Sequence, residues 1–218
     1  MTDDRMLNEH VTECAAAHQR LLGSLDTLTD SECRQPSLLP DWSRGHVLTH
    51  LARNADSHTH LLVAAGNGEI ADQYPGGIKA RNQAIEDGSN RSAGDLIKDV
   101  RSSIYSLEAA WAAATPVTWA GEGRTTRGAV IPMSDIVFLR WREVEVHHAD
   151  LGCEFGWQQW SDLYVRSELA RQLTTRRNSD PMGSAELPQI AKELSPAHRL
   201  AWLLGRVDVD GLTKPDSF

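Results

Sequence analysis

Glu143 and His147 are of types and at a spacing that could bind a metal ion. They stand four residues apart in the run SDIVFLRWREVEVHHADLG, so on a helix both side chains project from one face. A third candidate, His50, lies in the run HVLTHLARNAD. Two imidazoles and one carboxylate are typical of an open catalytic zinc site, in which water or substrate takes the fourth position. Such a centre has a net positive charge, which favours a thiolate or an oxyanion.

The chain contains nine histidines, and several of them leave other ligand sets open. His46 and His50 are also four residues apart, so they form a rival pair on one predicted helix. His58, His60 and His148 lie near enough in the sequence to compete as ligands. A glutamate four residues before a histidine is also common on surface helices as an ordinary side-chain pair. The spacing alone therefore does not choose the ligands.

Apolar residues recur at helical spacing in the segments that carry these candidates. The four long segments with this spacing run over residues 4–28, 43–65, 92–114 and about 134–152. Ser43, Ser92 and Ser134 are expected to cap the starts of the last three, and Gly152 suits the end of the fourth. Four long helices with short connections predict a four-helix bundle, which builds metal sites from inward-facing residues of different helices.

The remaining segments are shorter or irregular. We expect a further helix over about 78–87, a hairpin or ordered loop over 117–132, and helical stretches over about 162–177 and 196–205 that are separated by a polar loop. The predicted fold class is therefore mainly α, a four-helix bundle with a short, reduced C-terminal appendage. We expect a metal-binding bundle over residues 1–155 and a short helical region over 156–218.

Composition excludes several classes of protein. The 218 residues carry a net charge of −8, with 40% hydrophobic and 24% charged residues, which is ordinary for a globular protein. No apolar run reaches the roughly 18 residues of a membrane span, and the acidic balance argues against nucleic acid as a partner. Residues 1–9 lack the apolar core of a secretory signal. Three cysteines without a CxxC pair favour a reducing cytoplasm over a disulfide framework.

Two longer motifs resemble those of a known family. The first is SLLPDWSRGHVLTHLARNAD, in which the matching residues are Ser37, Leu39, Trp42, Ser43 and His50. The second is REVEVHHADLG, in which the matching residues are Arg142, Glu143, Val144, Val146, His147, Asp150, Leu151 and Gly152. Together they are similar to the motifs of the mycothiol-dependent maleylpyruvate isomerase family, whose fold resembles DinB-like four-helix proteins.

The resemblance implies a particular ligand set. It assigns the metal to His50, Glu143 and His147, and it leaves out His46 and His148. The implied metal is zinc or another divalent ion.

Other positions follow from the same resemblance. A weaker motif in the tail places the family's C-terminal arginine, near the active site, at Arg206. Arg81 and Asn82 lie in a family-like Ala-Arg-Asn run and are candidates for binding the polar part of a thiol. Arg53 and Asn54 follow His50 by one helical turn and could face the same cavity.

The implied reaction is a cis–trans isomerisation of a maleylpyruvate-type dicarboxylate. A low-molecular-weight thiol adds to the double bond, the new single bond rotates, and elimination leaves the trans product. Mycothiol is the family's thiol, and ergothioneine is an alternative. A thiol S-transferase acting on an electrophile would use the same ligands. A metal-sequestering protein and a non-catalytic DinB-like protein are further alternatives. The expected partners are small molecules, and the chain is expected to be a monomer or homodimer.

Overall fold

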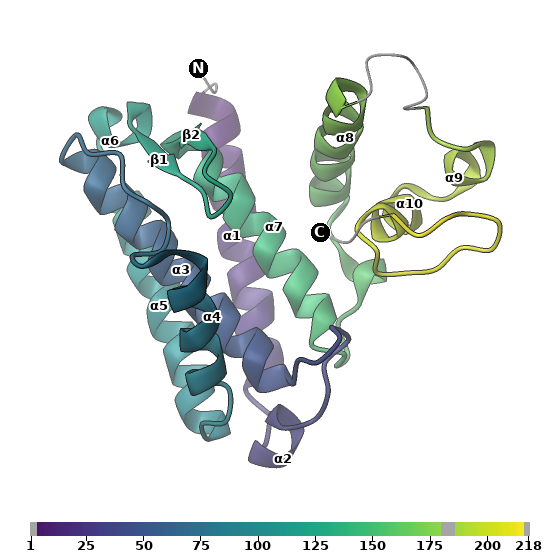
Figure 1. Cartoon of the computed structure of the whole chain (residues 1–218), viewed down its shortest axis with the longest axis horizontal. Coiled ribbons are helices and arrows are strands. Elements are labelled where there is room, and N and C mark those ends of the chain that lie inside the picture. The colour runs from purple at the N-terminus through teal and green to yellow at the C-terminus, as the bar shows by residue number, and fades with distance from the viewer. Residues whose placement is uncertain (1–3, 180–185, 216–218) are drawn as a thin grey trace. The chain divides into compact units, whose positions relative to one another are not determined.

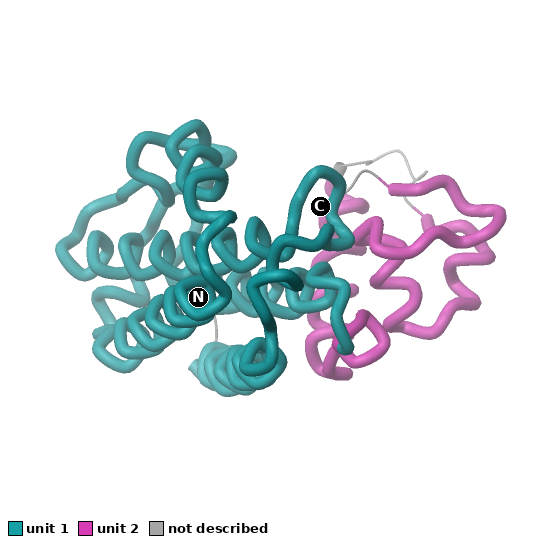
Figure 2. The backbone as a smooth tube through the Cα atoms, turned by 90° about the horizontal axis from the view of Figure 1, so that it is seen from below, with its two compact units in different colours: residues 1–154 teal, residues 155–218 magenta. Residues whose placement is uncertain are grey.

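The computed structural model describes residues 4–179 and 186–215. The chain forms two compact units, an N-terminal unit of residues 1–154 and a C-terminal unit of residues 155–218, which Figure 2 draws in different colours. The candidate ligands His50, Glu143 and His147 all belong to the N-terminal unit. That unit is therefore the one whose architecture has to explain the site.

Four long helices build the N-terminal unit: α1 (Asp4–Leu25), α3 (Arg44–Gly66), α5 (Ala93–Ala113) and α7 (Met133–Asp150). The principal packing contacts join α1 to α7, α7 to α3, α3 to α5, and α5 back to α1, so that the helices surround a common core (Figure 1). The prediction of a mainly α, four-helix bundle is confirmed. Because α3 and α7 are neighbours, side chains on their facing sides can meet.

The predicted helix starts are correct for α3 and α5 and wrong for α7. The Ser43 and Ser92 side chains accept hydrogen bonds from the backbone of the first turns of α3 and α5. In contrast, α7 begins at Met133, before Ser134, and its N-cap residue Pro132 makes no side-chain cap. The Met133 amide instead donates to the carbonyl of Gly121 at 3.0 Å. The preceding strand thus leads directly into α7.

Shorter elements complete the N-terminal unit. They are α2 (Asp30–Cys33), α4 (Gly77–Gly88), α6 (Pro116–Ala120) and an antiparallel hairpin of β1 (Glu122–Arg124) and β2 (Val130–Pro132). The hairpin expected within residues 117–132 is present, whereas α6 was not predicted. The C-terminal unit contains η1 (Trp157–Gln159), α8 (Asp162–Ser179), α9 (Gln189–Glu193) and α10 (Pro196–Leu203). None of the helices in the described part of the chain could cross a membrane.

The loop before α3 is tied to the end of α7. The Leu38 amide donates to the Asp150 carbonyl at 2.8 Å. Arg44 donates from Nε to the Leu151 carbonyl at 2.8 Å and from Nη2 to the Gly152 carbonyl at 3.0 Å. Gly152 has a φ of 64°, a conformation in which helices commonly end at glycine. These bonds hold the start of α3 beside the end of α7.

A close approach places α4 against α3. A Cβ atom on Gly45 would lie 2.1 Å from the carbonyl oxygen of Ser89, the residue that follows α4. Only glycine therefore fits at this point of α3. The contact fixes the end of α4 beside the first turn of α3, near the predicted ligand His50.

Candidate metal centre

His50 from α3 and Glu143 and His147 from α7 meet in the core of the bundle. Glu143 Oε2 lies 2.8 Å from His50 Nε2 and 3.3 Å from His147 Nε2. One ligand atom from each residue lies within 4.8 Å of the other two, and the two imidazole rings meet edge to face. Both histidines are buried and Glu143 is partly buried. The three atoms can therefore converge on one ion.

Asp150 fixes the orientation of His147. Its carboxylate Oδ2 lies 2.9 Å from His147 Nδ1, and its side chain is only 1% exposed. This bond places the proton of a neutral His147 on Nδ1, so Nε2 would then have a lone pair for a metal ion; without an ion, the protonated ring donates from Nε2 to Glu143. Carboxylate–histidine pairs of this kind orient the ligands of metal sites and raise their basicity.

The protonation of the three groups follows from their contacts. Burial alone would raise the pKa of the Glu143 carboxyl, but hydrogen bonds from His147 and His50 hold that pKa well below its usual value. Burial lowers the pKa of His50 to about 4. Burial also opposes the charged form of His147, but hydrogen bonds to Asp150 and Glu143 raise its pKa above 6.5. Glu143 is thus ionised and His50 neutral near pH 7.

The donor set fits a divalent ion. In the described residues, the ion-pair partners of Glu143 are His50 and His147 alone, so no lysine or arginine neutralises this carboxylate. Two imidazoles and one carboxylate suit zinc and related divalent metals, and three ligands leave a position open. The ligand set that the family resemblance implied therefore has a geometry compatible with metal binding.

Two of the competing histidines, His46 and His148, are engaged elsewhere. His46 Nδ1 lies 2.7 Å from Ser43 Oγ, within the capping box of α3, and its Nε2 lies 3.3 Å from Glu86 Oε2. His148 Nε2 lies 2.9 Å from Ser24 Oγ. The geometry therefore does not bring either histidine to Glu143.

A cavity of about 420 Å³ lies beside α3, and one of its lining residues contacts His50. It is lined by Arg53, Asp56, Ser57, His60, Gln73, Tyr74, Pro75, Ala80, Arg81 and Ala84, from α3, α4 and the loop between them. Arg81 connects the cavity to the centre, because its Nη2 lies 3.0 Å from His50 Nδ1. The guanidinium has only donors, so Nδ1 accepts this bond and Nε2 of His50 donates to Glu143.

The other residues proposed from the sequence lie in different surroundings. Arg53 lines the cavity and pairs with Asp99. Asn82 is exposed, and its Oδ1 accepts a bond from Arg81 Nη1 at 2.9 Å. Asn54 is buried, and its Oδ1 accepts a 2.7 Å bond from Arg140 rather than facing the cavity.

Arg206 belongs to the C-terminal unit. It follows α10, and its Nη1 donates a 2.7 Å hydrogen bond to the carbonyl of Leu204.

Sequence reasoning missed several residues near the centre. Gln73 and Tyr74 lie in a segment that was predicted only as a loop, yet both line the cavity. Arg140 was also missed, although it precedes Glu143 by three residues and so shares its helical face. A charged residue on the buried face of a helix is a signal that could have singled it out.

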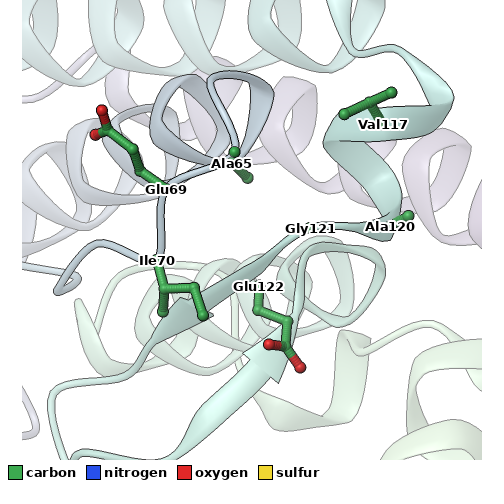
Figure 3. Close-up of a pocket in the computed structure, with 8 residues that line it drawn as sticks. Ala65, Glu69, Ile70, Val117, Ala120, Gly121 and Glu122 are labelled. Carbon is green, nitrogen blue, oxygen red and sulfur yellow. The ribbon is translucent and has the colours of Figure 1, made fainter.

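A second cavity, of about 450 Å³, lies at the far end of α3 (Figure 3). It is lined by Ala65, Gly68, Glu69, Ile70, Val117, Ala120, Gly121 and Glu122. None of these residues belongs to the ligand set. This cavity combines small apolar side chains with two carboxylates and offers no imidazole or thiol.

Comparisons with known proteins agree with this geometry. A family model described as the mycothiol maleylpyruvate isomerase N-terminal domain matches residues 14–152. The match includes all three candidate ligands and the whole of α3, α5 and α7. No curated protein matches the chain.

Solved structures share the fold. The crystal structure of the mycothiol-dependent maleylpyruvate isomerase is 24% identical, with a TM-score of 0.84, over 97% of each chain. A histidine-to-alanine mutant of such an isomerase is 23% identical, with a TM-score of 0.85, over 97% of each chain. YfiT from Bacillus subtilis, described as a probable metal-dependent hydrolase with an unusual four-helix bundle topology, is 14% identical. Its TM-score is 0.57, over 74% of this chain and 92% of that chain.

These structural likenesses confirm the DinB-like bundle predicted from the sequence. Because the first two comparisons cover 97% of both chains, the C-terminal region is short in those proteins as well. The shortness of residues 155–218 is therefore common to these structures and is not a loss in this chain.

Proposed function

The chain belongs to the mycothiol maleylpyruvate isomerase N-terminal domain family, and on this basis we propose that it is a metal-dependent isomerase that uses a low-molecular-weight thiol. Its substrate is a maleylpyruvate-type cis-dicarboxylate, which it converts to the trans isomer. The observation that carries this proposal is the convergence of His50, Glu143 and His147 around one point, with no permanent cation on Glu143 in the described part of the chain.

We propose zinc as the resident ion, held by His50 Nε2, His147 Nε2 and Glu143. When bound, a divalent ion with an open position would act as a Lewis acid that lowers the pKa of a thiol. Asp150 holds the His147 ring in the orientation that binding requires. His50 is neutral near pH 7, and it would bind an ion through Nε2 once its single proton shifts to Nδ1 and Arg81 releases that nitrogen.

The cavity beside α3 supports the choice of a polar thiol. Arg53, Gln73 and Ser57 supply hydrogen-bonding groups along its wall, and Tyr74 supplies an aromatic face. Polar groups of this kind suit a thiol that carries hydroxyls or a carboxylate, such as mycothiol or ergothioneine. Arg81 stands between this cavity and His50, so its guanidinium could bind an anionic group of the thiol or the substrate.

Arg206 is the second arginine in this proposal. We assign it to a carboxylate of the substrate, or to the enolate that forms when the thiol adds, because a guanidinium binds carboxylate oxygens in a bidentate manner. We further propose that residues 1–155 are the metal-binding domain, and that residues 156–218 are a helical region that contains Arg206. The three cysteines are free, which agrees with a cytoplasmic protein.

The decisive experiment combines metal analysis with an assay. We expect purified protein to contain about one divalent ion per chain, and to convert maleylpyruvate to the trans isomer when mycothiol is added. The assay is repeated with ergothioneine and with the chelated protein. Formation of a stable thiol adduct without isomerisation would instead identify an S-transferase. Absence of metal together with absence of turnover would exclude the proposal.

A further inference from the structure

The core of the bundle contains a buried arginine outside the ligand set. Arg140 lies on α7, three residues before Glu143, and is 0% exposed. No carboxylate in the described ranges, residues 4–179 and 186–215, forms an ion pair with it. A buried charge is costly, and apolar residues of similar size often replace one without loss of stability. Stability alone therefore gives no reason for an arginine at this position.

The bonds of Arg140 connect the two helices that supply the ligands. Its Nη1 donates to the carbonyl of Leu51 at 2.9 Å and to Asn54 Oδ1 at 2.7 Å. Leu51 and Asn54 lie one and four residues after His50 on α3. The guanidinium thus joins α7 to α3 about one helical turn away from the contact between His50 and Glu143.

The same guanidinium reaches the other two helices. Arg140 Nε donates to His18 Nε2 on α1 at 3.1 Å. His18 Nδ1 in turn lies 2.8 Å from Glu108 Oε1 on α5. Because Nε2 of His18 accepts from Arg140, its Nδ1 carries the proton and donates to Glu108. One chain of hydrogen bonds therefore links α3, α7, α1 and α5.

This chain of bonds sets the axial register of α7 against α3. Apolar packing between helices tolerates a slide from one groove to the next, which for one turn is about 5.4 Å. Such a slide would separate His50 Nε2 from Glu143 Oε2, which lie 2.8 Å apart. A guanidinium with acceptors fixed on α3 permits only one register, as buried polar groups do in other helical assemblies.

We propose that Arg140 is a positioning residue for the metal centre: by bonding Leu51 and Asn54 it fixes the register of α7, and so holds Glu143 and His147 against His50. The inference rests on the proposed function, since it takes these three residues as metal ligands. Arg140 itself does not touch the ion. It instead sets the distance between His50 on α3 and the two ligands on α7.

The test is the zinc affinity of the purified chain, measured by competition with a chromophoric chelator. We expect Arg140→Met to bind zinc about 10–100-fold more weakly than the wild type. Arg140→Lys, which keeps the charge and one donor group, should restore part of that affinity. The absorption spectrum of the Co²⁺-loaded protein should also change in Arg140→Met, because the ligand geometry is altered.

A matched control lies on the same helix. Glu145 is buried, and it pairs with Arg20 on α1. Glu145→Gln should therefore leave the zinc affinity within about threefold of the wild type, even where it lowers the melting temperature. This control distinguishes a loss of zinc affinity caused by a shifted register between α3 and α7 from a loss caused by lower overall stability.

The outcomes divide clearly. Wild-type affinity and an unchanged Co²⁺ spectrum in both Arg140 variants would overturn the inference while leaving the proposed function intact. Equal losses in Arg140→Met and Glu145→Gln would also overturn it, because the effect would then be general. A wild-type chain that binds neither zinc nor Co²⁺ would overturn the proposed function and this inference together. If Arg140→Met does not fold, the zinc affinity of Arg140→Lys is compared with those of the wild type and Glu145→Gln instead.

Discussion

Helix α7 presents two polar faces that contain similar residues but lie in different surroundings. Toward α3 it presents Glu143 and His147. Toward α1 it presents Glu145 and His148. Each face thus offers one carboxylate and one imidazole to a neighbouring helix, and all four residues come from one stretch of sequence.

The partners of these residues differ. Glu145 Oε1 accepts a 2.6 Å bond from Arg20 and a 3.1 Å bond from Trp141 Nε1, so a permanent cation already balances its charge. In the described part of the chain, Glu143 forms ion pairs only with His50 and His147. The proposed metal centre therefore differs from the network on the α1 face in that no arginine or lysine of the described residues forms an ion pair with its carboxylate, and not in the types of residue present.

The largest expected effect comes from removing a ligand on the α3 face. His50→Ala should weaken zinc binding by roughly 100-fold or more. This follows because a four-ligand zinc site contributes about 10–16 kcal/mol in total, or roughly 3 kcal/mol for each ligand. His148→Ala, on the α1 face, should leave the affinity unchanged. Isothermal titration of each metal-free variant with zinc, followed by far-UV circular dichroism, makes the measurement.

Either of two results would break this comparison. If His148→Ala lost zinc as His50→Ala does, the two faces would be energetically equivalent. If His50→Ala kept full affinity and full isomerase activity, the ligands would lie elsewhere.

The second prediction concerns stabilisation by the ion. An ion that binds only the folded chain at 100 times its Kd should stabilise it by about 2.7 kcal/mol. For a chain of this size that corresponds to a rise of roughly 5–10 °C in melting temperature. Glu145→Gln should lower the starting melting temperature but show the same rise. Calorimetry with and without zinc tests this, and an equal melting temperature in both conditions would contradict it.

The third prediction concerns the groups that orient each imidazole. Asp150→Asn should weaken zinc binding by about 10-fold, because the amide no longer holds His147 as a charged acceptor. Ser24→Ala removes the corresponding partner of His148 and should not change zinc binding. Comparing the zinc titrations of the two variants measures how much Asp150 contributes by orienting His147. Equal zinc affinities in both variants would refute this role.

The sequence predicted the helices of the bundle well because their signals are local. Serine caps at Ser43 and Ser92, and the apolar spacing between them, determine where α3 and α5 lie. The start of α7 was misplaced because its first amide bonds to Gly121, twelve residues earlier. Such a contact across a hairpin leaves no local trace in the sequence.

The site was predictable in part, for a similar reason. The spacing of Glu143 and His147 places both on one face, but it cannot say which helix faces them. The motifs of the family identified His50 as the partner, and the geometry places it 2.8 Å from Glu143. Asn54 shares that helical face with His50, yet Arg140 occupies its side chain. Contacts between helices, which periodicity does not encode, decided the surroundings of both residues.

The last prediction concerns the pH dependence that two buried histidines, one on α3 and one on α7, contribute to stability. Burial lowers the pKa of His58, on α3, to about 3 and that of His148 to about 4. Between these values and about 6.5, the unfolded chain binds protons that the folded chain does not. Stability is therefore present above pH 6.5 and is lost as the pH falls, by about 1.4 kcal/mol per pH unit for each histidine.

Replacing His58 with leucine should remove the contribution of this histidine to the change of unfolding free energy with pH. The replacement breaks no hydrogen bond at Nδ1, because that atom has no partner. His148→Leu should remove a similar share, at the cost of the bond to Ser24. Urea unfolding of metal-free protein between pH 7 and 5 measures both slopes. An unchanged slope in His58→Leu would mean that this histidine is protonated in the folded chain. Protonated His58 would then add positive charge near Glu143, and the α3 face would resemble the α1 face more closely.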